Sequence, residues 1–201
     1  MTGPLYPCSD IFASLQGEGH FVGYPMVFVR LAGCSVRDCF IRAECDEAPW
    51  KAKETLPVNL LIARVATMHC KIACITGGEP TDHDLLPLIA GLRGVGMRVH
   101  METSGVRSID GWPIDWVTVS PKSFDYVQRA GHTLKVVVRP GWTWAEVARL
   151  NEGTTFFHRY LQPMTAPDGT SNLPDVIDML RLNSAGDWAL STQAHKTWTV
   201  Q

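Results

Sequence analysis

Three cysteines stand close together in the segment from residue 31 to residue 47, which reads L-A-G-C-S-V-R-D-C-F-I-R-A-E-C-D-E. Cys34, Cys39 and Cys45 are near enough along the chain for three thiolates to reach one metal centre. A disulfide reading needs an even number of cysteines and an oxidising compartment, and the first residues have neither the charged nor the apolar region of a secretory signal. A metal site is therefore the better interpretation of this segment.

Two kinds of metal site fit the three thiolates. A structural zinc site needs a fourth protein ligand, which would have to come from His20 or Cys8, outside the segment. An iron-sulfur cluster is also held by thiolates, and with three cysteines one iron stays open to a small molecule. The residues alone leave both sites open. The remaining cysteines, Cys8, Cys70 and Cys74, are expected to be small buried or half-buried apolar residues.

The composition is that of an ordinary globular protein with one domain, residues 1–201. A net charge of -2 gives no basic field for tight binding of nucleic acid. No apolar run approaches the length of a membrane span. We therefore expect neither nucleic acid nor a membrane as a partner, and a cytoplasmic location in which thiols stay reduced.

Short apolar strands alternate with amphipathic helices along most of the chain. Helices are predicted to begin at Asn59, at Asp82, at a capping box formed by Thr143 and Glu146, and near Pro174. This alternation predicts an α/β fold with a parallel sheet. The predicted strands cover residues 26–31, 71–76, 97–103, 116–120, 133–138, 155–161 and 188–192.

Polar signatures stand at the ends of these strands. The cysteine segment follows the first strand, and T-G-G-E-P, E-T-S-G, S-P-K and Q-P-M stand at the ends of later ones. Ligands bind at the carboxyl edge of parallel strands, so we expect these signatures to meet there. The strands are too few for a closed eight-stranded barrel, which favours a partial barrel. Residues 11–20, I-F-A-S-L-Q-G-E-G-H, indicate either an ordinary turn or a backbone that passes close to a ligand.

These signatures together resemble those of the radical S-adenosylmethionine enzymes, and within them most closely the 7-carboxy-7-deazaguanine synthase family. The resemblance implies a partial (β/α)6 TIM-like barrel and a 4Fe-4S cluster on the three cysteines of the segment. S-adenosylmethionine would bind the open iron and yield a 5′-deoxyadenosyl radical on reductive cleavage. The matching motifs are L-Q-G-E-G at 15–19, F-V-R-L-A-G-C at 28–34, I-T-G-G-E-P at 75–80, E-T-S-G at 102–105, V-S-P-K at 119–122, L-Q-P at 161–163 and Q-A-H-K at 193–196.

The resemblance implies a lyase that converts 6-carboxy-5,6,7,8-tetrahydropterin to 7-carboxy-7-deazaguanine with loss of ammonia. That radical ring contraction lies on the route to queuosine and related 7-deazapurines. The resemblance further implies Mg2+ as a cofactor, an electron donor such as flavodoxin or ferredoxin, and a homodimer.

Individual residues receive roles from the same motifs. Arg30 can offer its fork of donors to a carboxylate or carbonyl of the substrate, or it can form a surface ion pair. His195 can contact the substrate or make a structural hydrogen bond. The residues that would contact the pterin are Leu15, Gln16, Gly17, Arg30, Thr76, Glu102 and His195. Those that would line S-adenosylmethionine are Glu44, Asp46, Gly78, Ser120, Pro121, Lys122 and Gln162.

The chain departs from the family pattern at two places. The usual intervals between the cysteines are three and two residues, whereas here they are four and five. The family has a threonine of its magnesium site where this chain has Glu47. Glu47 would either replace that threonine as a hard oxygen ligand of Mg2+ or face solvent after a shift of register.

Two other functions stay open at this point. A radical enzyme of the same kind could act on another substrate, as activases do on a partner protein. A non-catalytic, zinc-stabilised binding domain would explain the three cysteines, but it would not explain the ligand-facing motifs at the other strand ends.

Overall fold

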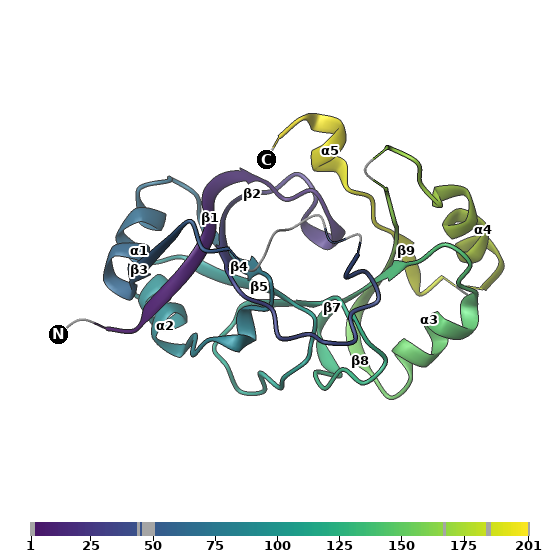
Figure 1. Ribbon diagram of the computed structural model, residues 1–201, viewed down its shortest axis with the longest axis horizontal. Coiled ribbons are helices and arrows are strands. Elements are labelled where there is room, and N and C mark those ends of the chain that lie inside the picture. The colour runs from purple at the N-terminus through teal and green to yellow at the C-terminus, as the bar shows by residue number, and fades with distance from the viewer. Residues whose placement is uncertain (1–2, 44, 46–50, 167, 184–185, 201) are drawn as a thin grey trace.

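The computed structural model describes residues 3–43, 45, 51–166, 168–183 and 186–200. They form a mixed α/β fold around a nine-stranded sheet of order β3-β1-β2-β4-β5-β6-β7-β8-β9. Within this described part the end strands β3 and β9 do not pair with each other, so the sheet is open (Figure 1). The strands are β1 (Leu5–Leu15), β2 (Pro25–Leu31), β3 (Glu54–Pro57), β4 (Ile72–Gly77), β5 (Arg98–Thr103), β6 (Trp116–Val119), β7 (Ala130–Val138), β8 (Thr155–Pro163) and β9 (Trp188–Leu190).

Strand β2 and strands β4 to β9 pair in parallel with one another. They are the strands that the sequence predicts. Each is rich in β-branched or other apolar residues, and β4 is buried from Ile72 to Thr76. Their carboxyl ends therefore lie along one edge of the sheet, as the sequence analysis expects.

β1 and β3 are absent from the sequence prediction. β1 pairs antiparallel with both β2 and β3, so residues 11–15 belong to a strand and the expected turn is wrong as far as Leu15. The buried side chains of β1, Tyr6, Cys8 and Ile11, are separated by one proline and by two adjacent polar residues. This irregular spacing hides the period-2 signal of a strand.

Four of the helices, α1 to α4, lie along the outer side of the curved row of strands, whereas α5 lies at its open side (Figure 1). The capping box of Thr143 and Glu146 opens α3 as predicted. The predicted caps at Asn59 and Asp82 are wrong, because Pro57 precedes α1 and Leu85 precedes α2 without a side-chain cap. The helices are α1 (Val58–Ala66), α2 (Leu86–Gly94), α3 (Trp144–Asn151), α4 (Leu173–Asn183) and α5 (Ala194–Trp198), with short 3-10 turns η1 (Gly19–Phe21) and η2 (Pro80–Asp82).

The two faces of the strands serve different purposes. Val27, Val29 and Ile75 belong to the main apolar core that also includes Leu61 of α1 and Leu88 of α2. Each such aliphatic side chain contributes about 1.5–3 kcal/mol when it is fully buried. The alternate positions of the same strands face the other side, where Met26, Phe28, Ile72 and Cys74 form a second apolar cluster. Arg30 and Thr76, at the ends of these strands, line a cavity on this inner face.

No helix among the described residues has both the length and the apolar character that crossing a membrane requires.

Candidate active site

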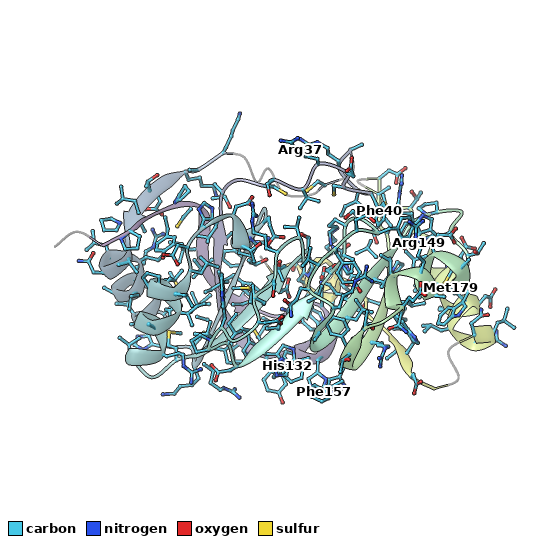
Figure 2. All side chains as sticks on the ribbon, turned by 90° about the horizontal axis from the view of Figure 1, so that it is seen from below. Arg37, Phe40, His132, Arg149, Phe157 and Met179 are labelled. Atoms are coloured by element: carbon cyan, nitrogen blue, oxygen red, sulfur yellow. The ribbon has the colours of Figure 1, made fainter. Side chains whose placement is uncertain are left out.

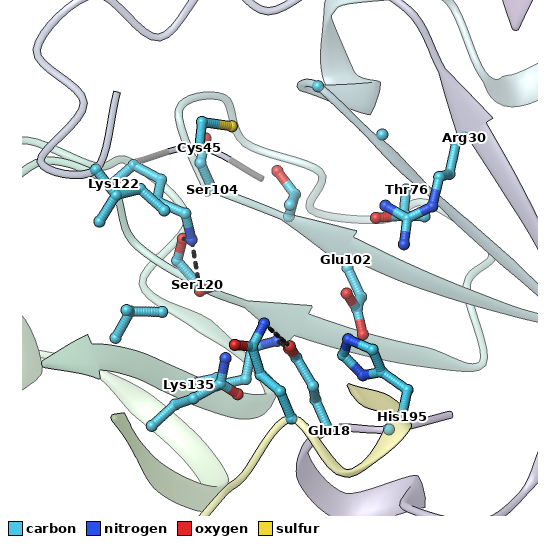
Figure 3. A pocket seen from close by; sticks show the side chains of 18 of the residues that line it. Glu18, Arg30, Cys45, Thr76, Glu102, Ser104, Ser120, Lys122, Lys135 and His195 are labelled. Atoms are coloured by element: carbon cyan, nitrogen blue, oxygen red, sulfur yellow. Dashed lines mark hydrogen bonds and ion pairs between the residues drawn. The ribbon is translucent and has the colours of Figure 1, made fainter. Parts of the chain in front are cut away.

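A cavity of about 250 Å³ opens on the inner face of the sheet. The carboxyl ends of β2, β4, β5, β6 and β8, the cysteine segment and the L-Q-G-E-G segment after β1 all line it, together with the start of α5. Figure 3 shows Ser120 and Lys122 on one side of this cavity and Arg30 and Thr76 on the other. Segments far apart in the sequence thus meet around one space.

Almost every predicted site residue that the structure describes lies at this cavity. All of the expected pterin contacts line it, namely Leu15, Gln16, Gly17, Arg30, Thr76, Glu102 and His195. Of the expected S-adenosylmethionine contacts, Gly78, Ser120, Lys122 and Gln162 line it. Pro121 is buried beside them but is not part of the lining. Glu44, Asp46 and Glu47 lie outside the described residues, so their roles stay predictions.

Cys34, Cys39 and Cys45 also line the cavity, and each carries a half-buried thiol. Burial raises the pKa of the Cys34 thiol, and Cys39 adds to this rise through its charge. Among the described residues no group of three or more His, Cys, Asp or Glu side chains is arranged to hold a metal ion. The three thiols at one cavity are nevertheless the donor set that a thiolate-bound cluster requires. Cys8 and Cys74 are buried and Cys70 is half-buried, as expected.

The glycines of T-G-G-E-P allow the cysteine segment to approach β4 closely. Gly77 has φ +128°, and a Cβ at this position would stand 2.1 Å from the carbonyl oxygen of Leu31. The amide of Gly78 donates to that same carbonyl at 3.0 Å, and the amide of Glu79 donates to Gly33 O at 2.9 Å. A side chain at residue 77 would therefore push the start of the cysteine segment away from β4.

Glu79 joins the loop after β4 to the loop after β5. Its carboxylate is fully buried and accepts hydrogen bonds from the amide and hydroxyl of both Thr81 and Ser104 and from the hydroxyl of Thr103. The Thr103 hydroxyl donates to Glu79 Oε1 at 2.6 Å. Five donors compensate for the burial of this charge and fix both loops at the rim of the cavity.

A buried ion pair lies at the floor of the cavity. The Lys135 ammonium contacts Glu18 Oε2, and Gln193 Nε2 donates to Glu18 Oε1 at 3.1 Å. Burial alone would raise the pKa of Glu18, but the Lys135 charge and hydrogen bonds from Lys135 and Gln193 lower it to about 2. Burial would lower the pKa of Lys135, and the Glu18 and Glu102 carboxylates raise it instead. Both members of the pair are therefore charged at neutral pH.

A second carboxylate at the floor is held differently. Gln16 Nε2 donates to Glu102 Oε1 at 2.9 Å. For Glu102 Oε2 the structure records no donor within the described part of the chain. Each carboxylate oxygen of Glu18 thus has a protein donor, whereas Glu102 retains one oxygen as an acceptor for a ligand.

The S-P-K segment after β6 carries the other lysine of the cavity. Lys122 Nζ donates to Ser120 Oγ at 2.7 Å and to Ser120 O at 2.9 Å (Figure 3). Burial, and then the charge of Lys135, lower the pKa of Lys122. The lysine is therefore folded back on its own strand end, where it adds a cation to the wall of the cavity.

The start of α5 closes the cavity against the L-Q-G-E-G segment. The amide of Ala194 donates to Gly17 O at 2.9 Å, and a Cβ on Gly17 would stand 2.1 Å from His195 Nδ1. Ser191 Oγ accepts from the amide of Gly19 at 2.9 Å and donates to Gln162 Oε1 at 2.9 Å. Glycine at position 17 is thus required for His195 to reach the floor.

Two functional residues of the cavity, Glu18 and Lys135, are not among the site residues predicted from the sequence. Lys135 stands in the apolar run T-L-K-V-V-V, which the sequence predicts as a buried strand. Lysine is almost never fully buried unless it is paired, so a lysine in a buried strand indicates an acidic partner. The identity of that partner depends on a contact across most of the chain, which no local pattern contains.

No protein-family model matches the chain. Among curated proteins it is 35% identical over 208 residues to the 7-carboxy-7-deazaguanine synthase of Synechocystis sp., which covers 95% of this chain and 91% of that protein. It is 31% identical to the enzyme of the same name from Escherichia coli (strain K12), with 95% and 97% of the two chains covered.

The fold leads to the same relatives. The crystal structure of QueE from Escherichia coli superposes with a TM-score of 0.72 at 29% identity and covers 95% of each chain. The sequence relatives and the structural relative both extend over almost the whole chain, which therefore belongs to the 7-carboxy-7-deazaguanine synthase family.

Proposed function

We propose that this chain converts 6-carboxy-5,6,7,8-tetrahydropterin to 7-carboxy-7-deazaguanine with loss of ammonia, as a lyase on the route to queuosine and other 7-deazapurines. The observation that carries this proposal is the meeting of the family's motif segments around one cavity that is also lined by three cysteine thiols. A partial (β/α)6 barrel is the finer description of the fold that we infer from the curved, open sheet.

Cys34, Cys39 and Cys45 would hold a 4Fe-4S cluster, because thiolates are its ordinary ligands and all three line the cavity. Gly78, Ser120, Lys122 and Gln162 would hold S-adenosylmethionine, with Pro121, Glu44 and Asp46 as further contacts. When bound, this pair of cofactors supplies the radical that abstracts a substrate hydrogen. Mg2+, with Glu47 as a ligand, an external electron donor, a homodimer and a cytoplasmic location complete the proposal.

Different side chains of the cavity would bind different groups of the substrate. Glu102 Oε2 can accept from the N–H donors of a pterin ring, while Gln16 holds the other oxygen of this carboxylate. Arg30, at the carboxyl end of β2, can take the substrate carboxylate with its guanidinium. Lys135 and Glu18 neutralise each other, so the Glu102 carboxylate and the Arg30 guanidinium would offer charges of opposite sign to the substrate. Substrate orientation follows from this pattern of charge.

The decisive experiment reconstitutes the protein anaerobically with iron and sulfide and supplies carboxytetrahydropterin, S-adenosylmethionine and a reductant. We expect 7-carboxy-7-deazaguanine by mass spectrometry, and no product from Cys34→Ala, because loss of one thiolate removes a third of the protein ligation of the cluster. Cys70→Ala, which changes a cysteine outside the cavity, is the matched control and should retain activity.

Other outcomes point to the other functions. A colourless protein that carries zinc would support the binding domain. Cleavage of S-adenosylmethionine without any conversion of the pterin would support another substrate.

A further inference from the structure

The cysteine segment is attached to the rest of the molecule at two separate places. The first is next to Cys34, where the Asp82 carboxylate accepts from the amide of Ser35 at 2.7 Å and from its hydroxyl at 2.5 Å. Arg107 donates to the same carboxylate and holds it in place. Together with the backbone bonds from Gly78 and Glu79, this polar attachment fixes the first cysteine against η2.

The second attachment is next to Cys39 and is mainly apolar. The ring of Phe40 packs edge-on against Phe124, with centroids 4.8 Å apart, and against Trp142, with centroids 5.1 Å apart. The Arg149 guanidinium lies 4.0 Å from the centroid of the Phe124 ring. Figure 2 shows Phe40 and Arg149 at one edge of the molecule, opposite the edge that carries His132 and Phe157.

The backbone at Phe40 reaches the S-P-K segment. Its amide donates to Lys122 O at 2.8 Å, so the residue that follows the second cysteine is hydrogen-bonded to the wall of the cavity. The neighbours of Phe40, Cys39 and Ile41, both line the cavity, whereas Phe40 itself packs against Phe124 and Trp142. Placing Phe40 in its aromatic contacts therefore turns the thiol of Cys39 toward the site.

We propose that Phe40 is a positioning residue that seats Cys39 for cluster binding. The proposal rests on the cluster assigned above. The positions of the first and second thiols are then set by Asp82 and by Phe40 and not by their distance along the chain. This explains how intervals of four and five residues can serve a site for which the family ordinarily uses three and two. Residues that orient a metal ligand commonly change metal affinity by about 10–100-fold when they are replaced.

The test compares Phe40→Ala, Phe40→Tyr and the control Phe157→Ala. Phe157 is 76% exposed and lies at the opposite edge, so its removal leaves the cysteine segment untouched. Each protein is reconstituted, its iron content is measured, and a chelator is added while the thiolate-to-iron absorption is followed. We expect Phe40→Ala to lose its cluster about tenfold faster than the parent. The Tyr variant, which keeps the ring, and the Phe157 control should behave like the parent.

A second measurement uses the cluster-free chain, so that it does not depend on the proposed function. The alkylation rate of each cysteine is followed by mass spectrometry. In Phe40→Ala we expect Cys39 to react about tenfold faster, while the rate of Cys34 is unchanged because its neighbour Ser35 is still held by Asp82. The buried Cys74 reports on the fold as a whole.

Equal cluster lifetimes in the parent and in Phe40→Ala would overturn the proposal. So would equal Cys39 alkylation rates in these two proteins, even if no variant assembles a cluster. A rise at Cys74 that parallels the rise at Cys39 would also overturn it, because Phe40 would then serve the fold and not the cysteine segment. A third outcome separates the two proposals. If the parent takes up no iron while Cys39 alone becomes more reactive in Phe40→Ala, the cluster assignment is wrong and the positioning of Cys39 by Phe40 is supported.

Discussion

At the scale of single residues, the floor of the cavity depends on a lysine that the protein keeps almost fully out of water. The Lys135 side chain is 6% exposed and the Glu18 side chain 14%. Removal of charges from water is costly, and a pair of this kind is retained only when its geometry and remaining hydrogen bonds are satisfied. Gln193 supplies one of those remaining bonds. The pair therefore joins β7, the L-Q-G-E-G segment and the start of α5.

Replacement of Lys135 by methionine should destabilise the protein strongly, because it leaves Glu18 buried without its cation. We expect a loss of about 3–5 kcal/mol in the free energy of unfolding. The double variant Lys135→Met/Glu18→Gln should recover part of it. Urea denaturation of the parent, both single variants and the double variant measures the coupling energy. If the loss in the double variant equals the sum of the losses in the two single variants, this account of the pair is contradicted.

Gly17→Ala should affect substrate binding more than stability. The new Cβ would occupy the place of His195, so the start of α5 must move away from the floor. We expect a KM for carboxytetrahydropterin raised about tenfold or more, the effect of a loss of about 1.4 kcal/mol in binding, with S-adenosylmethionine affinity retained. Gly94→Ala is the control, because its Cβ would meet nothing within 4 Å. Equal KM values in Gly17→Ala and in the parent would show that α5 takes no part in binding.

At the scale of elements, the ends of neighbouring strands are tied together by buried charge. Glu79 stands where β4 passes into η2, and its partners Thr103 and Ser104 stand at the end of β5. The parallel pairing of these two strands ends at Ile75 and Met101, before the polar signatures begin. Beyond that point the Glu79 carboxylate takes over the role of the backbone ladder.

Glu79→Gln should separate the two loops although it is nearly isosteric. The side-chain amide of the new glutamine would point an N–H group at a hydroxyl or backbone N–H that donates to Glu79 in the parent protein. One buried donor would then have no acceptor. We expect a loss of about 2 kcal/mol in the free energy of unfolding. Hydrogen exchange should rise at the amide of Ser104, which donates to Glu79 at 2.8 Å. Unchanged protection of this amide in Glu79→Gln would contradict the proposed link.

The elements that the sequence predicts are those whose signal is local. Runs such as V-F-V and I-A-C-I, together with the capping box at Thr143, identify strands and a helix start from a few adjacent residues. β1 escapes prediction because its buried residues are irregularly spaced, although its partner β2 follows it closely in the chain. The short strand β3 escapes prediction because it is defined by its pairing with β1, which lies about 50 positions earlier. Asp82 resembles a helix cap locally, yet its carboxylate is used by Ser35 and Arg107.

The residues of the candidate site likewise divide into those that local motifs predict and those that depend on distant contacts. The motif residues Arg30, Thr76 and Glu102 can be placed from the sequence, because parallel strands bring their carboxyl ends to one edge. The pairing of Lys135 with Glu18 cannot, because it joins residues 117 positions apart.

At the scale of the whole molecule, a stack of histidine and tryptophan rings lies away from the cysteine segment. Trp116 stacks on His20, with centroids 4.8 Å apart, and on His132, with centroids 4.7 Å apart. His158 lies 4.1 Å from His20, and His100 lies 6.3 Å from Trp116. Figure 2 shows His132 at the edge opposite Phe40. The stack brings four imidazoles together around one indole.

This stack should make the stability of the protein depend on pH. Burial, and then the charge of Arg98, lower the pKa of His100 to about 4, and burial also lowers the pKa of His20 and of His132. A lowered pKa means that the unfolded chain takes up protons more readily. The stabilisation is therefore complete above about pH 6.5 and is lost as the pH falls toward 4, by about 3 kcal/mol for His100 alone.

Urea denaturation of the cluster-free chain at pH 7 and pH 4.5 measures this loss. His100→Phe keeps an aromatic ring in the stack but cannot take up a proton. We expect its free energy of unfolding to fall less between the two pH values than that of the parent. An equal fall in both proteins would exclude His100 as the group responsible.

The contact between the L-Q-G-E-G segment and α5 has a consequence for the order in which the protein is made. Gln193 and Glu18 are 175 positions apart, so a ribosome must deliver the chain as far as Gln193 before the floor can close. The cysteine segment and its attachments at Asp82 and Phe40 require only residues up to about Arg149, which emerge earlier. The contacts of Ser35 and Phe40 can thus form before the contact of Glu18 with Gln193, so opposite parts of the cavity become available at different moments of translation.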